Sequence, residues 1–196
     1  MKNSDIKIKN VELYFLPVET RVPLKFGPET LTYVTCARVK VEVENREGKR
    51  AAGWGETPLS VQWVWPSDLG YEERHVALKE FCERLVSGWK QHAVVGHAME
   101  LGVDFIDNVL PLQLEAFNEE RGEHEKMPWL AALVACSAFD IAVHDAYGIV
   151  NNVHIYKTYN AEYMNKDLSE WLIPADDADI SFDGKYPEDY LVSQQL

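Results

Sequence analysis

Three ionisable side chains in the middle of the chain have the residue types of a metal site. His97, Glu100 and Asp104 are three and four residues apart, so on a helix they would share one face and could hold a metal ion. The same spacing is typical of a solvated polar face or of a helix cap. The pattern His-x-x-Glu also differs from the zinc motif His-Glu-x-x-His. We therefore expect these residues to be structural and assign no metal ligand to them.

A second pair, Asp140 and His144, lies four residues apart near the end of an apolar segment. A carboxylate so placed can hydrogen-bond to the imidazole and bias its proton. No nucleophile motif or second base accompanies the pair, and the chain has neither a Gly-x-Ser-x-Gly elbow nor a phosphate-binding loop. The sequence favours a polar cluster that anchors a helix end, and it assigns no catalytic residue.

The acidic segment 179–184 resembles the opening of a calcium-binding loop, with alternating oxygen ligands and a glycine. Such a loop has a bidentate glutamate at its twelfth position, where this chain has Tyr190. We expect a solvated acidic turn here, with a calcium-dependent protein as the weaker alternative.

Composition limits the classes of partner. The chain has 196 residues, of which 46% are apolar and 26% charged, the balance of a globular domain or of one domain plus part of another. Its 19 basic against 32 acidic residues give a net charge of −13. Such a charge repels phosphate backbones and anionic lipid, so we expect neither nucleic acid nor a membrane surface as a partner.

Cysteine use and hydropathy predict a cytoplasmic protein. Three cysteines lie far apart in apolar segments without a Cys-x-x-Cys pair, as in a reducing compartment. The polar first ten residues lack the apolar region of a signal peptide. The longest apolar run, 129–139, is shorter than the roughly 18 residues that span a bilayer, so we expect it in the core.

The hydrophobic pattern predicts an α+β fold in which a β-meander precedes a helical bundle. Strands are expected at 6–16, 32–44 and 50–56, with the last two joined as a hairpin and a loop carrying Phe26 at 22–28. Helices are expected at 71–90, at 98–110 with an end near Pro111, and at 128–148. A polar linker is expected at 118–126 and a short strand at 153–159.

The order of these parts is similar to that of a known family. The loop at 23–28, the segment Gly-Trp-Gly-Glu-Thr-Pro at 53–58 and the pattern Ala-x-Asp-x-Ala-x-x-Asp-x-x-Gly at 138–148 together resemble the N-terminal capping domain of the enolase superfamily, in its mandelate racemase and muconate lactonizing branch. The resemblance covers about residues 6–160. It implies a capping domain at 1–150 and the start of a truncated (β/α) barrel at 151–196, with the strand at 153–159 as the first barrel strand.

The resemblance also implies a chemistry. Enzymes of this family remove a proton α to a carboxylate and stabilise the enediolate on Mg²⁺. Their metal ligands and acid/base residues lie on later barrel strands, and the 46 residues after residue 150 are too few for a barrel of roughly 200 residues or more. We therefore expect the front of a Mg²⁺-dependent dehydratase or racemase/cycloisomerase, inactive by itself, with a small carboxylate as substrate and a homo-oligomer as the family analogy suggests.

In this family two cap loops reach over the substrate, and they match 24–27 and 57–63 here. The resemblance implies specificity roles for Lys25, Phe26, Thr57 and Trp63. Lys25 would pair with a substrate carboxylate, while Phe26 and Trp63 would exclude water and so strengthen electrostatic interactions. Each of these could equally be a surface residue packed on its own domain. The alternative function is a freestanding, non-catalytic α+β module for binding or interaction.

Overall fold

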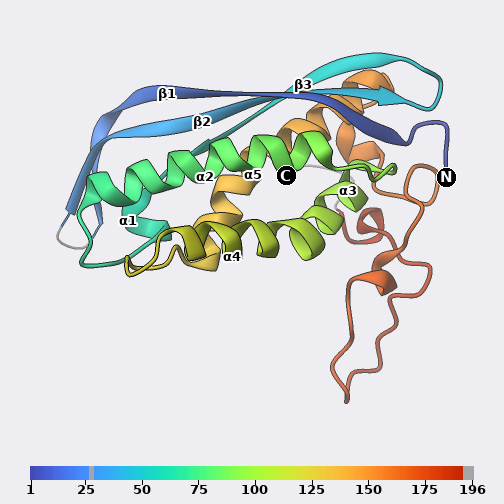
Figure 1. Ribbon diagram of the computed structural model, residues 1–196. Helices are drawn as coiled ribbons and strands as arrows, with labels where there is room; N and C mark the ends of the chain where they lie inside the picture. The colour runs from blue at the N-terminus through green and yellow to red at the C-terminus, as the bar shows by residue number, and fades with distance from the viewer. Residues whose placement is uncertain (27–28, 192–196) are drawn as a thin grey trace.

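The computed structural model describes residues 1–26 and 29–191, and it shows a three-stranded sheet covered by helices (Figure 1). The sheet is antiparallel in the order β1-β2-β3. The strands are β1 (Ile6–Phe26), β2 (Glu29–Asn45) and β3 (Arg50–Pro58), and the helices are α1 (Val61–Val64), α2 (Tyr71–Gln91), α3 (Ala98–Asp104), α4 (Leu110–Glu120) and α5 (Trp129–Val150). The α+β class and the meander followed by helices are confirmed.

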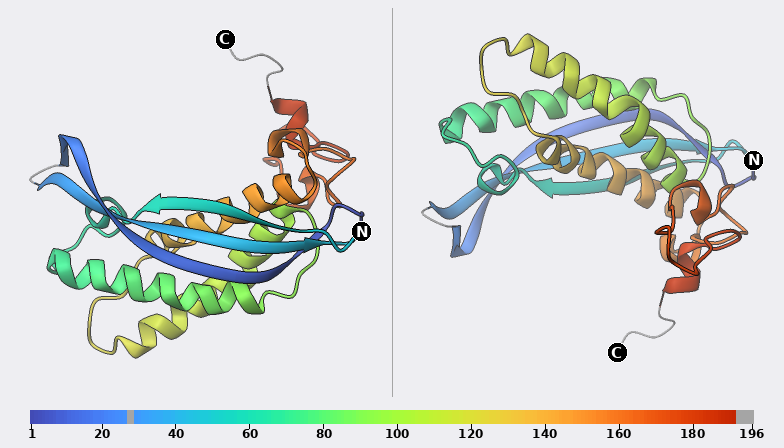
Figure 2. Two further views of the ribbon diagram at one scale, coloured as in Figure 1. Left: turned by 90° about the horizontal axis from the view of Figure 1, so that it is seen from above. Right: turned by 90° about the horizontal axis from the view of Figure 1, so that it is seen from below.

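One face of the sheet is buried under helices, and the other face is exposed to solvent. Val39, Val41 and Val43 of β2 are fully buried on the side of the helices, where α2 and α5 lie (Figure 2). The intervening residues form cross-strand ion pairs on the other side, such as Lys40 with Glu12 at 3.4 Å. The predicted alternation of β2 is confirmed, and it determines which face receives the helices.

Helix α5 lies unusually close to β3 because both elements use small residues where they meet. A Cβ added to Gly53 would lie 2.1 Å from the backbone N of Ala146, and one added to Gly55 would lie 2.0 Å from the carbonyl O of Ala138. The Gly-Trp-Gly segment therefore allows the helix backbone to contact the strand backbone. The segments 53–58 and 138–148, two of the three sequence motifs, therefore pack directly against each other.

Asp145 of α5 also bonds to β3. Its Oδ2 atom accepts the backbone N–H of Trp54 at 2.8 Å, which satisfies a donor on the free edge of the sheet. Asp145→Ala should therefore lower the free energy of unfolding by about 1 kcal/mol, and Asp145→Asn, which keeps an acceptor, should lose less. Urea unfolding measures the loss, and amide hydrogen exchange at Trp54 locates it. Unchanged exchange at Trp54 in the alanine variant would refute the role of this bond.

The predicted loop at 22–28 is largely wrong. Strand β1 continues to Phe26 and pairs with β2 as far as Glu29, whereas residues 27–28 lie outside the described part. Pro17 and Pro23 are tolerated because β1 is an edge strand, and the pairing is irregular between Glu19 and Leu24. The prolines therefore do not end the strand, and a long β1–β2 hairpin projects from the sheet (Figure 2).

The helix predicted for 98–110 does not end at Pro111. A π-helical turn, η1 (Phe105–Val109), follows α3, and α4 begins directly after it with Pro111 in its first turn. Proline is compatible with that position because its missing N–H would have no partner there. Helix α4 then extends to Glu120, so the predicted linker is shorter than expected. The helices predicted for 71–90 and 128–148 are confirmed as α2 and α5.

The strand predicted for 153–159 is wrong. A 3-10 turn, η2 (Ile155–Lys157), lies there instead, and turn hydrogen bonds such as Thr158 N–H to the carbonyl O of Ile155 satisfy its backbone. Further 3-10 turns are η3 (Leu168–Glu170) and η4 (Pro187–Tyr190). A parallel strand needs a neighbouring strand to pair with, and the described part of 151–191 contains none. The division into a barrel from residue 151 stays a prediction.

Helix α5 is the central core element. By length and composition it could span a membrane, but half of its most apolar window is buried inside this chain. It packs against the sheet and against Trp89 of α2, whose ring stacks on Phe105 at 3.9 Å between centroids. The expectation of a core position for residues 129–139 agrees with this packing.

Candidate functional site

The two segments expected to set specificity lie at the same end of the sheet. The backbone N–H of Leu59 donates to the carbonyl O of Thr35 at 2.8 Å, so the chain after β3 is held against β2. Helix α1 follows, with Val61 and Val64 buried and Trp63 exposed. The projecting β1–β2 hairpin, which carries Lys25, extends from β2 beyond this point.

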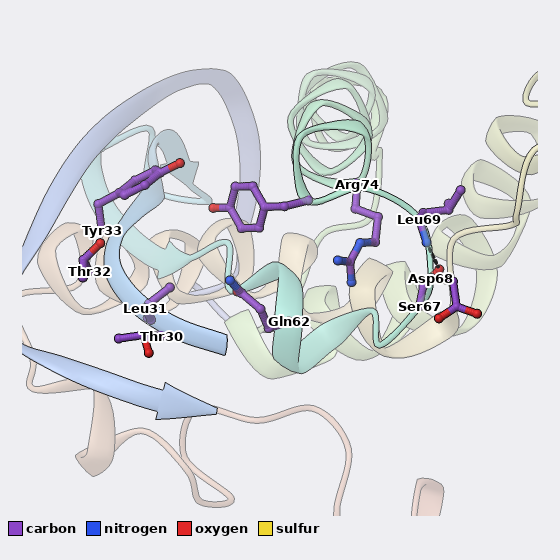
Figure 3. A pocket seen from close by; sticks show the side chains of 10 residues that line it. Thr30, Leu31, Thr32, Tyr33, Gln62, Ser67, Asp68, Leu69 and Arg74 are labelled. Carbon is purple, nitrogen blue, oxygen red and sulfur yellow. Dashed lines mark hydrogen bonds between the residues drawn. The ribbon is translucent and has the colours of Figure 1, made fainter. Parts of the chain in front are cut away.

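A cavity of about 590 Å³ lies between the hairpin, α1 and the start of α2 (Figure 3). We call it the α1 groove, and its lining residues are Thr30, Leu31, Thr32, Tyr33, Gln62, Ser67, Asp68, Leu69, Tyr71 and Arg74. This volume suits a small organic ligand.

Arg74 is the buried cation of the α1 groove. Only 3% of its surface is exposed, and its guanidinium donates to the backbone carbonyls of Trp65 and Gly70. Nearby, Glu125 accepts hydrogen bonds from Ser67 and from the Trp65 indole. These two bonds, with a smaller contribution from the charge of Arg74, hold the pKa of Glu125 below its usual value. Arg74 therefore organises the turn between α1 and α2.

Three of the predicted specificity residues, Lys25, Thr57 and Trp63, are not among the residues that line the α1 groove. Lys25 is exposed and lies opposite Thr30 in the hairpin, and Trp63 is 54% exposed beside Gln62. Thr57 is 8% exposed and lies opposite Ala37 inside the sheet. The side chain of Phe26 lies outside the described residues. The specificity roles of all four stay predictions.

The sequence interpretation missed Arg74, although the signal for it was present. Arg74 lies four residues before Leu78 and seven before Phe81, which places an arginine on the apolar stripe of α2. A buried charge on such a stripe indicates a special partner or a ligand. Gln62 lies inside the predicted segment 57–63 but was not singled out there.

The Asp140 and His144 pair is part of a half-buried cluster in the C-terminal half of α5. His144 Nε2 is 3.7 Å from Asp140 Oδ1, and its Nδ1 is 2.9 Å from the hydroxyl of Tyr159. Burial lowers the pKa of His144, partly offset by Asp140, and burial raises the pKa of Asp140. Burial also raises the pKa of Tyr159 to about 12. The cluster joins α5 to the segment after it, in agreement with the anchoring role expected from the sequence.

His97 and Glu100 form the N-terminal cap of α3 and do not join Asp104. His97 Nδ1 accepts the N–H of Met99 at 3.2 Å, and Glu100 accepts the N–H of His97 at 3.0 Å. Asp104 instead contacts His92 at 2.8 Å. Within residues 1–26 and 29–191, no group of three or more histidine, cysteine or acidic side chains could hold a metal ion. The residues present therefore do not fit the Mg²⁺ that the resemblance implies.

Comparisons with known proteins give structural neighbours only. No family model matches the chain, and no curated protein matches it. A dipeptide epimerase from Enterococcus faecalis V583, solved with Mg and the dipeptide L-Leu-L-Tyr, is 17% identical with a TM-score of 0.44 and covers 79% of this chain. A member of the enolase superfamily from Roseovarius nubinhibens ISM is 16% identical with a TM-score of 0.43 and covers 74%.

A third neighbour is a mandelate racemase/muconate lactonizing enzyme-like protein from Rubrobacter xylanophilus, 18% identical with a TM-score of 0.41, which covers 77% of this chain. These neighbours are enolase-superfamily proteins. The chain spans only 35%, 31% and 33% of the three structures. At such identities and TM-scores, the likeness does not establish an activity for this chain.

Proposed function

We propose that this chain is the N-terminal capping part of an enolase-superfamily enzyme that removes the α-proton of a small carboxylate substrate, of the dehydratase or racemase/cycloisomerase type. The observation that carries the proposal is the convergence of 24–26 and 57–63, at one end of the sheet, around the α1 groove. Two further motifs support it, because 53–58 and 138–148 pack together as one structural unit.

The outward face of α5 supports the proposal that another domain covers this one. Leu130, Ile141 and Ile149 are 42%, 47% and 52% exposed, at spacings that place them along one side of the helix. Aligned apolar side chains of this kind are typical of a surface that packs against another unit. We assign a barrel as that unit, and we assign the metal ligands and the acid/base residues to it.

The barrel and this chain would then have different roles. The barrel would supply the ligands of Mg²⁺, and the bound ion would supply Lewis-acid chemistry there. The residues of this chain would cover the substrate: Trp63 would exclude water, and Lys25 would attract a carboxylate remote from the reacting carbon. Such contacts are made equally before and during proton transfer, so they govern substrate binding more than the chemical step.

The test uses the protein encoded when the gene is read past the codon for Leu196. In that protein, Lys25→Met is expected to raise KM for an anionic substrate about tenfold while kcat changes less than twofold. Lys9→Met removes the same charge from an exposed site on β1, far from the hairpin tip, and is expected to leave both constants unchanged. An equal effect of the two substitutions, or a loss confined to kcat, would contradict a specificity role for Lys25.

One observation favours the second candidate, a freestanding binding module. The α1 groove is formed by described residues of this chain alone, so it needs no barrel to exist. An in-frame stop codon after Leu196 would favour this module, whereas a continuing frame with three carboxylates at strand ends favours the enzyme.

A further inference from the structure

A second cavity, of about 470 Å³, lies where the C-terminal half of α5 meets the turn η2. We call it the η2 hollow. Its volume suits a small organic group, and it shares no lining residue with the α1 groove. Two isoleucines line it together with six polar or aromatic residues, which are Trp54, Asp140, His144, Asp145, Tyr156 and Tyr159.

The two carboxylates of the η2 hollow lack a permanent cation. Within residues 1–26 and 29–191, neither Asp140 nor Asp145 has a lysine or arginine within ion-pair distance. Asp140 faces His144 at 3.7 Å, but burial lowers the pKa of this imidazole, so the ring is neutral near pH 7. Asp145 accepts the neutral backbone N–H of Trp54. The hollow therefore attracts a cation, as does the net charge of −13.

The tyrosine rings of the η2 hollow point to the same kind of ligand independently of the carboxylates. The ring centroids of Tyr156 and Tyr159 are 5.9 Å apart and their planes meet at 73°, so the two rings form adjoining walls. An aromatic face attracts an ammonium or guanidinium group within about 6 Å of its centroid. The ring of Trp54 already has Lys40 Nζ at 5.9 Å, so we assign the ligand to the two tyrosines.

An inorganic ion fits the η2 hollow less well than an organic one. Ca²⁺ and Mg²⁺ require several oxygen ligands, and the described part of the chain has no group of three histidine, cysteine or acidic side chains that could hold a metal. We propose that the η2 hollow binds an organic cation with an alkylammonium or alkylguanidinium head group. Asp140 and Asp145 attract the charged head, and the faces of Tyr156 and Tyr159 contact it and its neighbouring carbon atoms.

Such a head group has two sources. One is a free molecule, and the other is a lysine or arginine side chain of the unit that we propose to cover α5. Ile141 connects the two surfaces, because it lines the η2 hollow and also belongs to the exposed apolar side of α5. The second source rests on the proposed function, whereas affinity for the head group is a property of this chain.

The binding test titrates the 196-residue chain with n-butylammonium chloride and follows NMR shifts of the Tyr156 and Tyr159 rings. We expect a dissociation constant on the order of 1 mM to 10 mM, as suits so small a ligand. The neutral isostere n-butanol should bind about tenfold more weakly, and sodium chloride at equal concentration should give no saturable shift. Absence of saturable binding by n-butylammonium, or equal binding of n-butanol, would overturn the proposal.

Substitutions test the carboxylate and the ring separately. Asp140→Asn removes one charge at constant size and should weaken binding about tenfold. Asp107→Asn removes the same charge from an exposed site outside the hollow and should leave binding unchanged. Tyr156→Phe keeps the aromatic face and should bind normally, whereas Tyr156→Leu should bind about threefold more weakly. Equal effects within either pair of variants would contradict the proposed site.

The protein read past Leu196 distinguishes the two sources. Unchanged affinity for n-butylammonium in that protein indicates a free molecule. Loss of binding, together with a lower free energy of unfolding for Asp140→Asn than for Asp107→Asn, indicates a side chain of the covering unit. Loss of binding with equal stability of the two variants would overturn the proposal. If the longer protein lacks α-proton chemistry while the 196-residue chain binds n-butylammonium, the proposed function fails and the site stands.

Discussion

Replacing Gly55 with alanine is expected to lower the free energy of unfolding by about 3 kcal/mol or more. The new Cβ would lie 2.0 Å from the carbonyl O of Ala138 and 2.6 Å from the backbone N of Ala142, and a backbone cannot rotate away as a side chain can. The α5 helix must therefore move off the sheet. Gly53→Ala should have a similar effect, because its Cβ would meet the backbone of Ala146.

Urea unfolding followed by circular dichroism measures the loss, with Gly70→Ala as the matched control. Gly70 has open space around its Cβ position and no positive φ, and since it is the N-cap residue of α2, its substitution should cost no more than about 1 kcal/mol. If Gly55→Ala were as mild as Gly70→Ala, the close contact between β3 and α5 would be wrong, and with it the structural reason for both motifs.

The chain is expected to lose stability on acidification through the buried His97. Burial, with smaller contributions from the charges of His144 and Lys2, lowers the pKa of His97 from 6.5 to about 3. The geometry agrees: Nδ1 accepts the N–H of Met99, and Nε2 lies 2.9 Å from Thr158, which itself donates to a carbonyl. The neutral ring thus uses both nitrogens, and a proton on Nδ1 would break the helix cap.

Because the folded pKa is the lower one, the unfolded chain binds more protons between pH 6.5 and about 3. The free energy of unfolding therefore falls as the pH drops through this window, by up to about 1.4 kcal/mol per pH unit for His97. His144, whose pKa burial also lowers, acts in the same direction. Asp140 opposes both, because burial raises its pKa and the folded chain then takes up its proton first.

Equilibrium unfolding between pH 7 and pH 4 measures this dependence, and His97→Asn isolates the part of His97. Asparagine can accept the Met99 N–H as a cap but does not titrate. The number of protons taken up on unfolding, which is the slope of the free energy of unfolding against pH, should therefore decrease by nearly one. The same slope in the variant and the parent chain would show that His97 is not the titrating group.

The periodic parts of the fold could be predicted, and the parts decided by tertiary contact could not. The alternation of Val39, Val41 and Val43 identified β2 and its buried face, and the apolar spacing from Leu78 to Trp89 identified α2. Pro23 and Pro111 misled the prediction, since each is tolerated at a position that only the tertiary structure reveals: an edge strand and a first helical turn. Residues 153–159 have strand composition, but the described part of the chain places no strand beside them.

The structure gives the position of the two predicted specificity segments, whereas their role in specificity stays a prediction. The family resemblance placed two segments near a substrate, and the structure brings those segments together around a groove. It then shows that Gln62 and Arg74, rather than Lys25 and Trp63, line the groove. Which side of a short helix faces a cavity depends on how Val61 and Val64 pack, and a four-residue helix has too little periodicity to reveal this.

The central claim is that this chain covers an active site supplied by the protein that follows it. The most direct measurement is the exchange of α-protons for deuterium in small hydroxy- and amino-carboxylates, observed by NMR in D₂O with and without Mg²⁺. We predict Mg²⁺-dependent exchange of at least one such compound by the protein read past Leu196, and no exchange by the 196-residue chain. Exchange by the 196-residue chain, or none by the longer protein with any carboxylate, would contradict the claim.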